Sequence, residues 1–289
     1  MADATPVVSI GMPVYNCEST VALSIRSVQK QTFTDWELIV IDDGSSDRTA
    51  DVVLSFRDPR IRLIADGTNR RLAKRLNEAV ALARGKFFAR MDGDDVAFPH
   101  RLESQLRFLR DHPNVDLLGG QHIVFRGDGE FLGIIRQVSD HDSICGSLIS
   151  GFTLSHPTWF GERGWFLKHP YNVSCRRAQD RELLLRAHRD SRFAALEEYI
   201  HGYREDGVYL SKTMAARLAF LKYGASDMLR HREYARVSVF AAIQVAKMAF
   251  DAAAVASGLK YKMLRHRALP APVEVRRQWE EVWKEISEN

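Results

Sequence analysis

Three carboxylates stand within four residues of the sequence, in the segment Asp92-Gly93-Asp94-Asp95. Like charges this close repel one another unless a cation or hydrogen-bond donors compensate them. Alternate carboxylates around a glycine can chelate a hard divalent cation, and that cation can also hold a diphosphate. Two aspartates separated by one residue occur often by chance, so the interpretation depends on where the fold places this segment.

The elements around this segment are predicted to alternate between strands and helices. Short apolar runs indicate strands at residues 7–12, 37–41, 61–64 and 86–91. Helical patterns lie between them, with Ser19 and Asp47 as N-caps of the first two helices. This alternation is typical of an α/β fold with a mostly parallel sheet and right-handed crossovers.

Ligands of such a sheet bind beyond the carboxyl ends of its strands. Polar segments follow three of these ends, at residues 13–16, 42–47 and 92–95. We therefore expect all three to face one crevice, with a divalent cation held by the last. A further helix is predicted with Leu102, Leu106 and Leu109 inward, followed by strands at 117–124 and 131–138 joined by a turn at residues 127–129.

Composition sets outer limits on the class of protein. Hydrophobic residues make up 45% and charged residues 27% of the 289-residue chain, which excludes wholesale disorder and a collagen-like repeat. The three cysteines, Cys17, Cys145 and Cys175, are too few and too widely spaced for a disulfide framework or a zinc cluster. The N-terminus lacks the basic and apolar regions of a secretory signal, so a cytoplasmic location is expected.

The charge is distributed unevenly along the chain. Residues 1–203 carry 26 basic and 27 acidic side chains, whereas residues 204–289 carry 15 basic and 10 acidic ones. We therefore predict a nearly neutral domain over residues 1–205 and a basic helical extension over residues 206–289.

Several segments together resemble the family 2 glycosyltransferases, which have the GT-A fold. The closest matches are the turn at residues 13–16, the run from Gln31 to Asp47, and Met91-Asp92-Gly93-Asp94-Asp95. The resemblance is close over about residues 6–110 and continues more loosely, through residues 155–158 and 179–183, to about residue 205. It is specific to the family and does not identify a sugar.

The resemblance implies that one sugar moves, with inversion, from a nucleoside-diphosphate sugar, most often a UDP-sugar, to an acceptor hydroxyl. The positions implied for the base and ribose are Pro13, Tyr15 and Asp43, with Asn16 beside them and Asp92 near the ribose. The positions implied for Mg²⁺ or Mn²⁺ are Asp92, Asp94 and Asp95. The basic candidates for the diphosphate are Arg71, Lys74 and Arg75.

Asp180 matches the catalytic base of the family. Inversion needs one in-line displacement, so one carboxylate suffices to take the proton of the acceptor hydroxyl. The metal would stabilise the departing diphosphate as a Lewis acid. Asp180 also lies near a predicted helix start, where the helix dipole favours its ionised form. The alternative is a surface aspartate paired with Arg181.

The sequence departs from the family pattern in two places. Gln179 precedes the candidate base, where the family often has an acidic residue. The Q-x-x-R-W motif of processive synthases is missing, which favours a transferase that adds a single sugar. His156 lies in a stretch that resembles acceptor-side sequence of bacterial members, and a structural role is its alternative.

The segment 237–259 is apolar but is interrupted by Gln244, Lys247 and Asp251, so it makes a poor membrane span. Its basic neighbours are Arg230, Arg232, Arg236, Lys260, Lys262, Arg265 and Arg267. Two alternatives stay open: a helical pair packed on the catalytic domain, or an interfacial element on an anionic leaflet near a lipid-linked acceptor. The helices after Leu210 could also form a homodimer surface. Nucleic acid is not expected as a partner, because stacking aromatics do not interleave the basic positions.

The main hypothesis is thus a metal-dependent inverting glycosyltransferase of cell-surface polysaccharide synthesis, acting on a glycan or lipid-linked acceptor. A nucleotidyltransferase would need a basic, glycine-rich loop near the N-terminus, which residues 13–19 lack. A non-catalytic protein that binds a sugar nucleotide is the third alternative.

Overall fold

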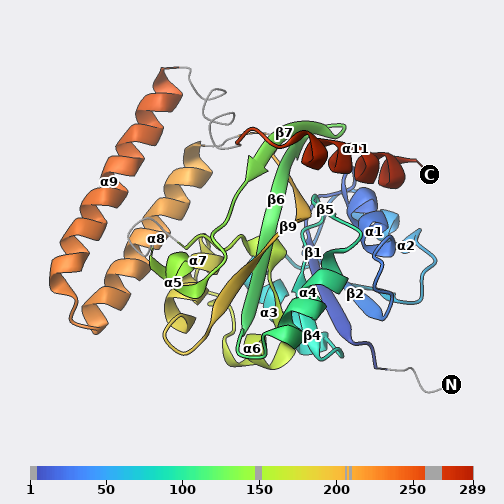
Figure 1. Ribbon diagram of the computed structural model, residues 1–289, viewed down its shortest axis with the longest axis horizontal. Coiled ribbons are helices and arrows are strands. Elements are labelled where there is room, and N and C mark those ends of the chain that lie inside the picture. The colour runs from blue at the N-terminus through green and yellow to red at the C-terminus, as the bar shows by residue number, and fades with distance from the viewer. Residues whose placement is uncertain (1–4, 147–151, 206, 208–209, 258–268, 289) are drawn as a thin grey trace.

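The computed structural model describes residues 5–146, 152–205, 207, 210–257 and 269–288. One mixed β-sheet with helices on both faces forms its body, and two long helices project from one side (Figure 1). The strands are β1 (Val8–Val14), β2 (Trp36–Asp42), β3 (Ile61–Ala65), β4 (Phe87–Arg90), β5 (Val96–Ala97), β6 (Leu117–Arg126), β7 (Glu130–Ile135), β8 (Phe160–Glu162) and β9 (Phe193–Arg204). The helices are α1 (Val21–Gln29), α2 (Thr49–Leu54), α3 (Leu72–Leu82), α4 (Arg101–Asp111), α5 (His141–Gly146), η1 (His156–Thr158), α6 (Arg163–Lys168), α7 (Gln179–Ala187), α8 (Leu210–Arg230), α9 (Tyr234–Ala256) and α11 (Val273–Ser287).

The first half of the sheet is parallel, as predicted. The strand order is β3-β2-β1-β4-β8-β6-β9-β5, and β1 pairs in parallel with both β2 and β4. Every residue of β1 and β2 is buried, because helices cover both faces; such strands are expected to be apolar along their whole length. Val14 is in register with Asp42, so the carboxyl ends of the two strands lie side by side.

The second half of the sheet is mixed. β8 runs antiparallel to both β4 and β6, and it therefore joins the two halves. β6 pairs in parallel with β9 and forms an antiparallel hairpin with β7. The predicted turn of this hairpin is confirmed, with Gly127 at φ 54° and Gly129 at φ 100°, values that glycine adopts without strain.

Helices α1, α2 and α4 pack on one face of the sheet, and α3, α5, α6 and α7 pack on the other. The predicted inward residues of α4, Leu102, Leu106 and Leu109, are buried. On the opposite face, Leu76 of α3 belongs to the same buried cluster as Phe88 of β4. The two layers fix the carboxyl end of β4, from which the acidic segment leaves the sheet.

Neither predicted N-cap is the residue that directly precedes its helix. Arg48 is the N-cap of α2, and Asp47 before it accepts a hydrogen bond from the Thr49 N–H at 3.0 Å. Ser19 is not the N-cap of α1, because Thr20 precedes the first helical residue. The Thr20 hydroxyl donates to the Gly93 carbonyl oxygen at 2.9 Å, so it ties α1 to the acidic segment.

The residues after 205, predicted as one extension, occupy two places. α8 and α9 form a helical hairpin in which Phe220 meets Phe240 edge to face at 5.3 Å, and Arg217 pairs with Asp251. α11 instead returns to the sheet, on the side where α1 lies (Figure 1). The predicted basic residues Lys260, Lys262, Arg265 and Arg267 lie outside the described residues.

Helix α11 completes a third buried cluster of the molecule. Trp279, Val282 and Ile286 face the sheet, with the spacing of one helix face. The Trp279 ring lies 4.7 Å from the Phe125 ring, and its Nε1–H donates to the Gly129 carbonyl oxygen at 2.9 Å. The last helix therefore covers the hairpin of β6 and β7.

Replacing Trp279 by Ala is expected to lower the free energy of unfolding by about 3–5 kcal/mol, because the large side chain is fully buried. Denaturant unfolding followed by circular dichroism measures the loss. Val273 is 77% exposed at the start of the same helix, so Val273→Ala is the control and should change the free energy by less than about 0.5 kcal/mol. Equal stabilities of the two variants would contradict the anchoring of α11 by Trp279.

Candidate active site

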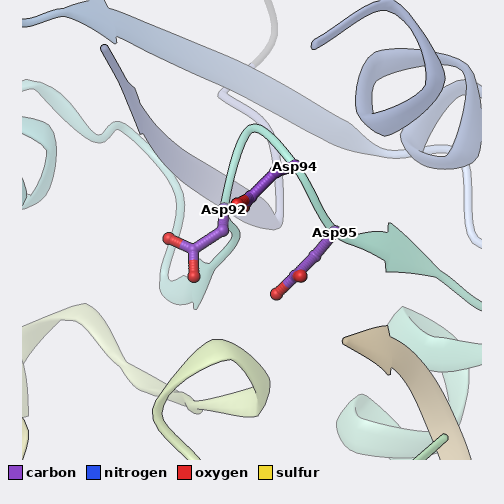
Figure 2. Close-up of side chains that lie close together, drawn as sticks. All are labelled: Asp92, Asp94 and Asp95. Atoms are coloured by element: carbon purple, nitrogen blue, oxygen red, sulfur yellow. The ribbon is translucent and has the colours of Figure 1, made fainter. Parts of the chain in front are cut away.

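The acidic segment forms a compact group of carboxylates on the loop between β4 and β5. One oxygen each from Asp92, Asp94 and Asp95, called here the acidic triad, lies within 4.8 Å of the others. Figure 2 shows the three side chains on this loop, with those of Asp92 and Asp95 pointing to the same side. Gly93 is required between them, because a Cβ atom there would lie 2.6 Å from Cγ1 of Val14.

The loop is fixed from the side of α1. In addition to the Thr20 bond to Gly93, the Ser24 hydroxyl donates to the Asp95 carbonyl oxygen at 2.6 Å. The contact of Gly93 with Val14 places the loop directly against the end of β1. The triad is therefore held next to the strand ends that carry the other predicted site residues.

The charges of the triad are only partly compensated. Asp92 pairs with Arg90, whose side chain is 4% exposed, and Arg90 Nε has no hydrogen-bond partner among the described residues. Burial and the charge of Asp92 raise the pKa of Asp95. Desolvation, Asp95 and Asp92 raise the pKa of Asp94 to about 8, although part of its side chain reaches the surface.

A divalent cation fits this group. Oxygen ligands from several carboxylates suit Mg²⁺ and Mn²⁺. Burial, followed by mutual repulsion, raises the pKa values of Asp94 and Asp95, and a nearby cation would favour the ionised carboxylates. The donor set of the triad is thus of the kind that the sequence predicted for a metal.

A cavity of about 500 Å³ opens beside the triad. Asp92, His156 and Asp180 all line it, although they lie far apart in the sequence. Arg181 and Arg136 also line this cavity. The structure therefore brings the acidic segment, the predicted acceptor-side histidine and the predicted base to one place.

Asp180 lies in the first turn of α7, as the sequence predicted. The helix begins after Ala178, which has a left-handed backbone with φ 56°. The side chain is half-buried at the cavity wall. At this position the partial positive charge of the helix N-terminus attracts a negatively charged side chain.

His156 is a neutral polar group in the cavity wall. Its Nε2 lies 2.8 Å from the Tyr171 hydroxyl, and its ring meets Trp159 edge to face at 4.6 Å. Burial, with a smaller effect of the Arg90 charge, holds the pKa of His156 well below its usual range. The ring therefore presents a fixed, uncharged surface to a ligand at neutral pH.

Apart from Asp92, the predicted nucleoside residues lie at the adjoining strand ends and not among the lining of the cavity. Pro13 is buried in β1, whereas Tyr15 is 50% exposed. Asn16 has φ 52°, and its Oδ1 accepts a hydrogen bond from the Ser46 N–H at 2.9 Å. This bond joins the loops that follow β1 and β2.

Asp43 is held in place by donors from the start of α3. It accepts hydrogen bonds from the backbone N–H groups of Arg70 at 2.6 Å and Arg71 at 2.9 Å. The Arg75 Nε–H donates to Asp43 as well, at 2.9 Å. A carboxylate with three donors from one segment has a fixed direction, as a ligand-binding group requires.

The three basic candidates differ in what they can reach. Arg75 is fully buried, and its donors are taken by Asp43, Asp66, Glu78 and the Thr68 carbonyl oxygen. It therefore positions Asp43 and is corrected from a diphosphate ligand to a supporting residue. The side chains of Arg71 and Lys74 are exposed at the same helix start.

The sequence interpretation missed the residues that support the triad. These are Arg90, Arg101, His201 and Arg204. The signal available in the sequence was a polar residue within a largely apolar strand, since Arg90 ends the buried strand β4 and His201 lies inside β9. Asp95 is the partner of His201 and lies more than 100 residues away from it in the sequence, which no local pattern reveals.

The comparisons with known proteins agree with this geometry. The sequence profile described as "Glycosyl transferase family 2" matches residues 9–186. The chain therefore belongs to glycosyl transferase family 2. It is 44% identical over 123 residues to "Putative glycosyltransferase EpsE" of Bacillus subtilis, a match that covers 42% of this chain and 44% of that protein.

It is also similar to "UDP-Glc:alpha-D-GlcNAc-diphosphoundecaprenol beta-1,3-glucosyltransferase WfgD" of Escherichia coli, with 39% identity over 122 residues, 42% of this chain and 48% of that protein. The matches thus span less than half the length of these two relatives. The crystal structure of S. aureus TarS 1-349 in complex with UDP-GlcNAc superposes with a TM-score of 0.66 and 19% identity, over 95% of this chain and 79% of that one. The predicted GT-A-type α/β fold with C-terminal helices is confirmed.

Proposed function

We propose that this chain is a metal-dependent, inverting glycosyltransferase that moves one sugar from a UDP-sugar to an acceptor hydroxyl in the synthesis of a cell-surface polysaccharide. The observation that carries the proposal is the position of Asp92 and Asp180 on one cavity. One wall of that cavity borders the acidic triad, and another holds Asp180, a carboxylate suited to accept a proton.

The residues divide the chemistry between them. Asp43, with Pro13, Tyr15 and Asn16, binds the base and ribose at the strand ends, and Arg71 and Lys74 approach the diphosphate from the start of α3. The acidic triad holds Mg²⁺ or Mn²⁺, which when bound supplies the Lewis acid for the leaving diphosphate. Asp180 accepts the proton of the acceptor hydroxyl as its oxygen attacks the anomeric carbon.

UDP is proposed as the donor nucleotide because of two likenesses. The WfgD name specifies UDP-Glc, and TarS has been crystallised with UDP and with UDP-GlcNAc. A ligand that binds only the folded protein raises its melting temperature by mass action. We expect UDP-sugars with Mn²⁺ to raise the Tm by several degrees, as measured by a thermal-shift screen, because binding at 100 times Kd adds about 2.7 kcal/mol.

The control for this screen is the same set of donors after metal removal with EDTA, together with GDP- and dTDP-sugars. We expect smaller increases in Tm from the UDP-sugars without metal and from the GDP- and dTDP-sugars. A shift from UDP-sugars that is independent of Mn²⁺ would contradict the metal-bridged diphosphate, and a shift from GDP-sugars alone would contradict the choice of base.

The acceptor is proposed to be lipid-linked, reached at an anionic membrane surface. The polar interruptions of the segment 237–259 predicted a poor membrane span. By length and composition, however, α9 is the one helix among the described residues that could cross a membrane, with a mean hydropathy of 1.6. Only 22% of that stretch is buried, and Val239, Val245 and Phe250 are more than half exposed. Arg230, Arg232 and Arg236 lie at the α8–α9 turn, where they can meet anionic headgroups.

Replacing Phe250 by Asp is expected to reduce recovery of the full-length chain with anionic vesicles several-fold, because a charge disfavours burial among lipids. Flotation with vesicles of phosphatidylcholine and phosphatidylglycerol measures this recovery. Leu54→Asp is the matched control, since Leu54 is 67% exposed on α2 and Phe250 is 66% exposed on α9. Equal recovery of both variants and the parent would contradict the membrane contact.

A further inference from the structure

A buried arginine connects four segments around the active site. The Arg101 side chain is fully buried, and its Nη2–H groups donate to the carbonyl oxygens of Arg90 at 2.7 Å and Pro157 at 3.0 Å. Its Nη1–H lies 3.1 Å from Nδ1 of His201. Arg101 thus contacts Arg90, which is close to Asp92 in the sequence, and Pro157, which follows His156. It also contacts His201 of strand β9.

This contact determines where His201 carries its proton. A guanidinium group only donates hydrogen bonds, so Nδ1 of His201 must accept the bond from Arg101. The proton of the ring therefore resides on Nε2, which lies 2.8 Å from Oδ2 of Asp95. Arg101 therefore donates to His201, and His201 donates to Asp95.

Asp95 receives a second bond from strand β9. The Arg204 N–H donates to its Oδ1 at 2.9 Å, so each carboxylate oxygen accepts one hydrogen bond from the protein. Two donors fix the plane of the carboxylate and leave lone pairs on both oxygens for a further partner. The neighbours of Asp95 on the loop are the other two carboxylates of the triad.

The neutral ring between Arg101 and Asp95 has a chemical consequence. A direct pair of guanidinium and carboxylate would cover both oxygens of Asp95 with a positive charge. The imidazole instead passes on the orientation through a neutral N–H group, so no guanidinium covers the oxygens of Asp95. Carboxylates and histidines in the outer shell of metal sites orient metal ligands in the same manner.

Resting on the proposed function, we propose that Arg101 and His201 are positioning residues, which hold Asp95 as a cation ligand and tie the acidic triad to the His156 side of the cavity. Through Arg101, a displacement of the segment at Pro157 is transmitted to β4 and to Asp95. One buried side chain, that of Arg101, thereby fixes the position of the acidic triad relative to the wall that holds His156.

The experiment compares Mn²⁺ affinity among full-length variants, measured from the electron paramagnetic resonance signal of free Mn²⁺ with and without UDP. We expect His201→Leu to weaken Mn²⁺ binding about 10- to 100-fold, the usual effect of removing an outer-shell partner. His201→Gln should bind Mn²⁺ several-fold more tightly than His201→Asn, because only the longer amide reaches the position of Nε2. This second pair retains a polar side chain, so the test does not depend on the Leu variant folding.

Glu37→Gln is the matched control for loss of stability. Glu37 is equally buried and bonded to Ser9 and Arg84, but it lies at the opposite end of β2 from the active site. It should leave Mn²⁺ affinity unchanged. Equal Mn²⁺ affinities of the parent and His201→Leu, or of His201→Gln and His201→Asn, would overturn this inference. Neither result would count against the proposed function of sugar transfer. Conversely, failure to detect transfer with these affinity differences present would count against the proposed function alone.

Discussion

Asp180→Asn is expected to lower kcat for sugar transfer by about 10²- to 10⁴-fold, the usual contribution of a positioned general base. The amide cannot accept the hydroxyl proton, yet it has the same size and occupies the same place in the first turn of α7. Binding of the UDP-sugar should stay within about two-fold of the parent. Steady-state kinetics and calorimetric titration with UDP measure the two quantities separately.

The control for this substitution is Asp51→Asn. Asp51 is exposed in the first turn of α2, so the variant removes the same helix-dipole interaction at a distance from the cavity. Unchanged turnover is expected there. Full turnover in Asp180→Asn would refute the assignment of the base. A parent chain that binds UDP-sugars but turns none over would instead support a non-catalytic binding protein.

Removal of divalent cations is expected to reduce transfer by about 10³-fold or more, because Lewis-acid stabilisation of a leaving group is worth several kcal/mol. Activity should return on addition of Mn²⁺ or Mg²⁺. Asp94→Asn should raise the Mn²⁺ concentration needed for half-maximal activity at least ten-fold, because one of the three convergent carboxylates becomes neutral. Activity measured against Mn²⁺ concentration after EDTA treatment gives both results.

Asp128→Asn provides the comparison for the triad variant. Asp128 is an exposed aspartate in the turn between β6 and β7. Its replacement by Asn therefore changes the net charge by the same amount as Asp94→Asn but leaves the triad unchanged. Its Mn²⁺ requirement should match that of the parent. Undiminished transfer in EDTA would contradict metal dependence, whichever variant is used.

The parts of the site predictable from sequence were those at the ends of apolar runs. The acidic triad follows a buried strand and Asp180 begins an amphipathic helix, and both patterns are local. The support of the site was not predictable, because it depends on long-range pairs. Arg75 resembled a free cation in the sequence, and only the fold brings Asp43 and Asp66 to it.

The final helix illustrates a signal that was present but not used. The sequence analysis grouped it with the extension of residues 206–289, whereas Trp279, Val282 and Ile286 carry the three- and four-residue spacing of a face buried against the sheet. Which surface this face would cover could not be deduced, because β6 and β7 precede it by some 150 residues. Periodicity indicates that a face is buried, and only the tertiary structure supplies its partner.

Helix α7 lies between the cavity and the projecting helices, and this position affects how shortened chains should be interpreted. Asp180 stands in its first turn, Arg181 lies over the Phe220 ring of α8, and Arg189 just beyond its end pairs with Asp227 of the same helix. Deleting everything after residue 205 would remove these contacts from the helix that carries Asp180, the proposed base. A shortened enzyme could thus lose turnover by misalignment of Asp180 even in a detergent solution without any lipid, so point substitutions on α9 are the sounder route to its role.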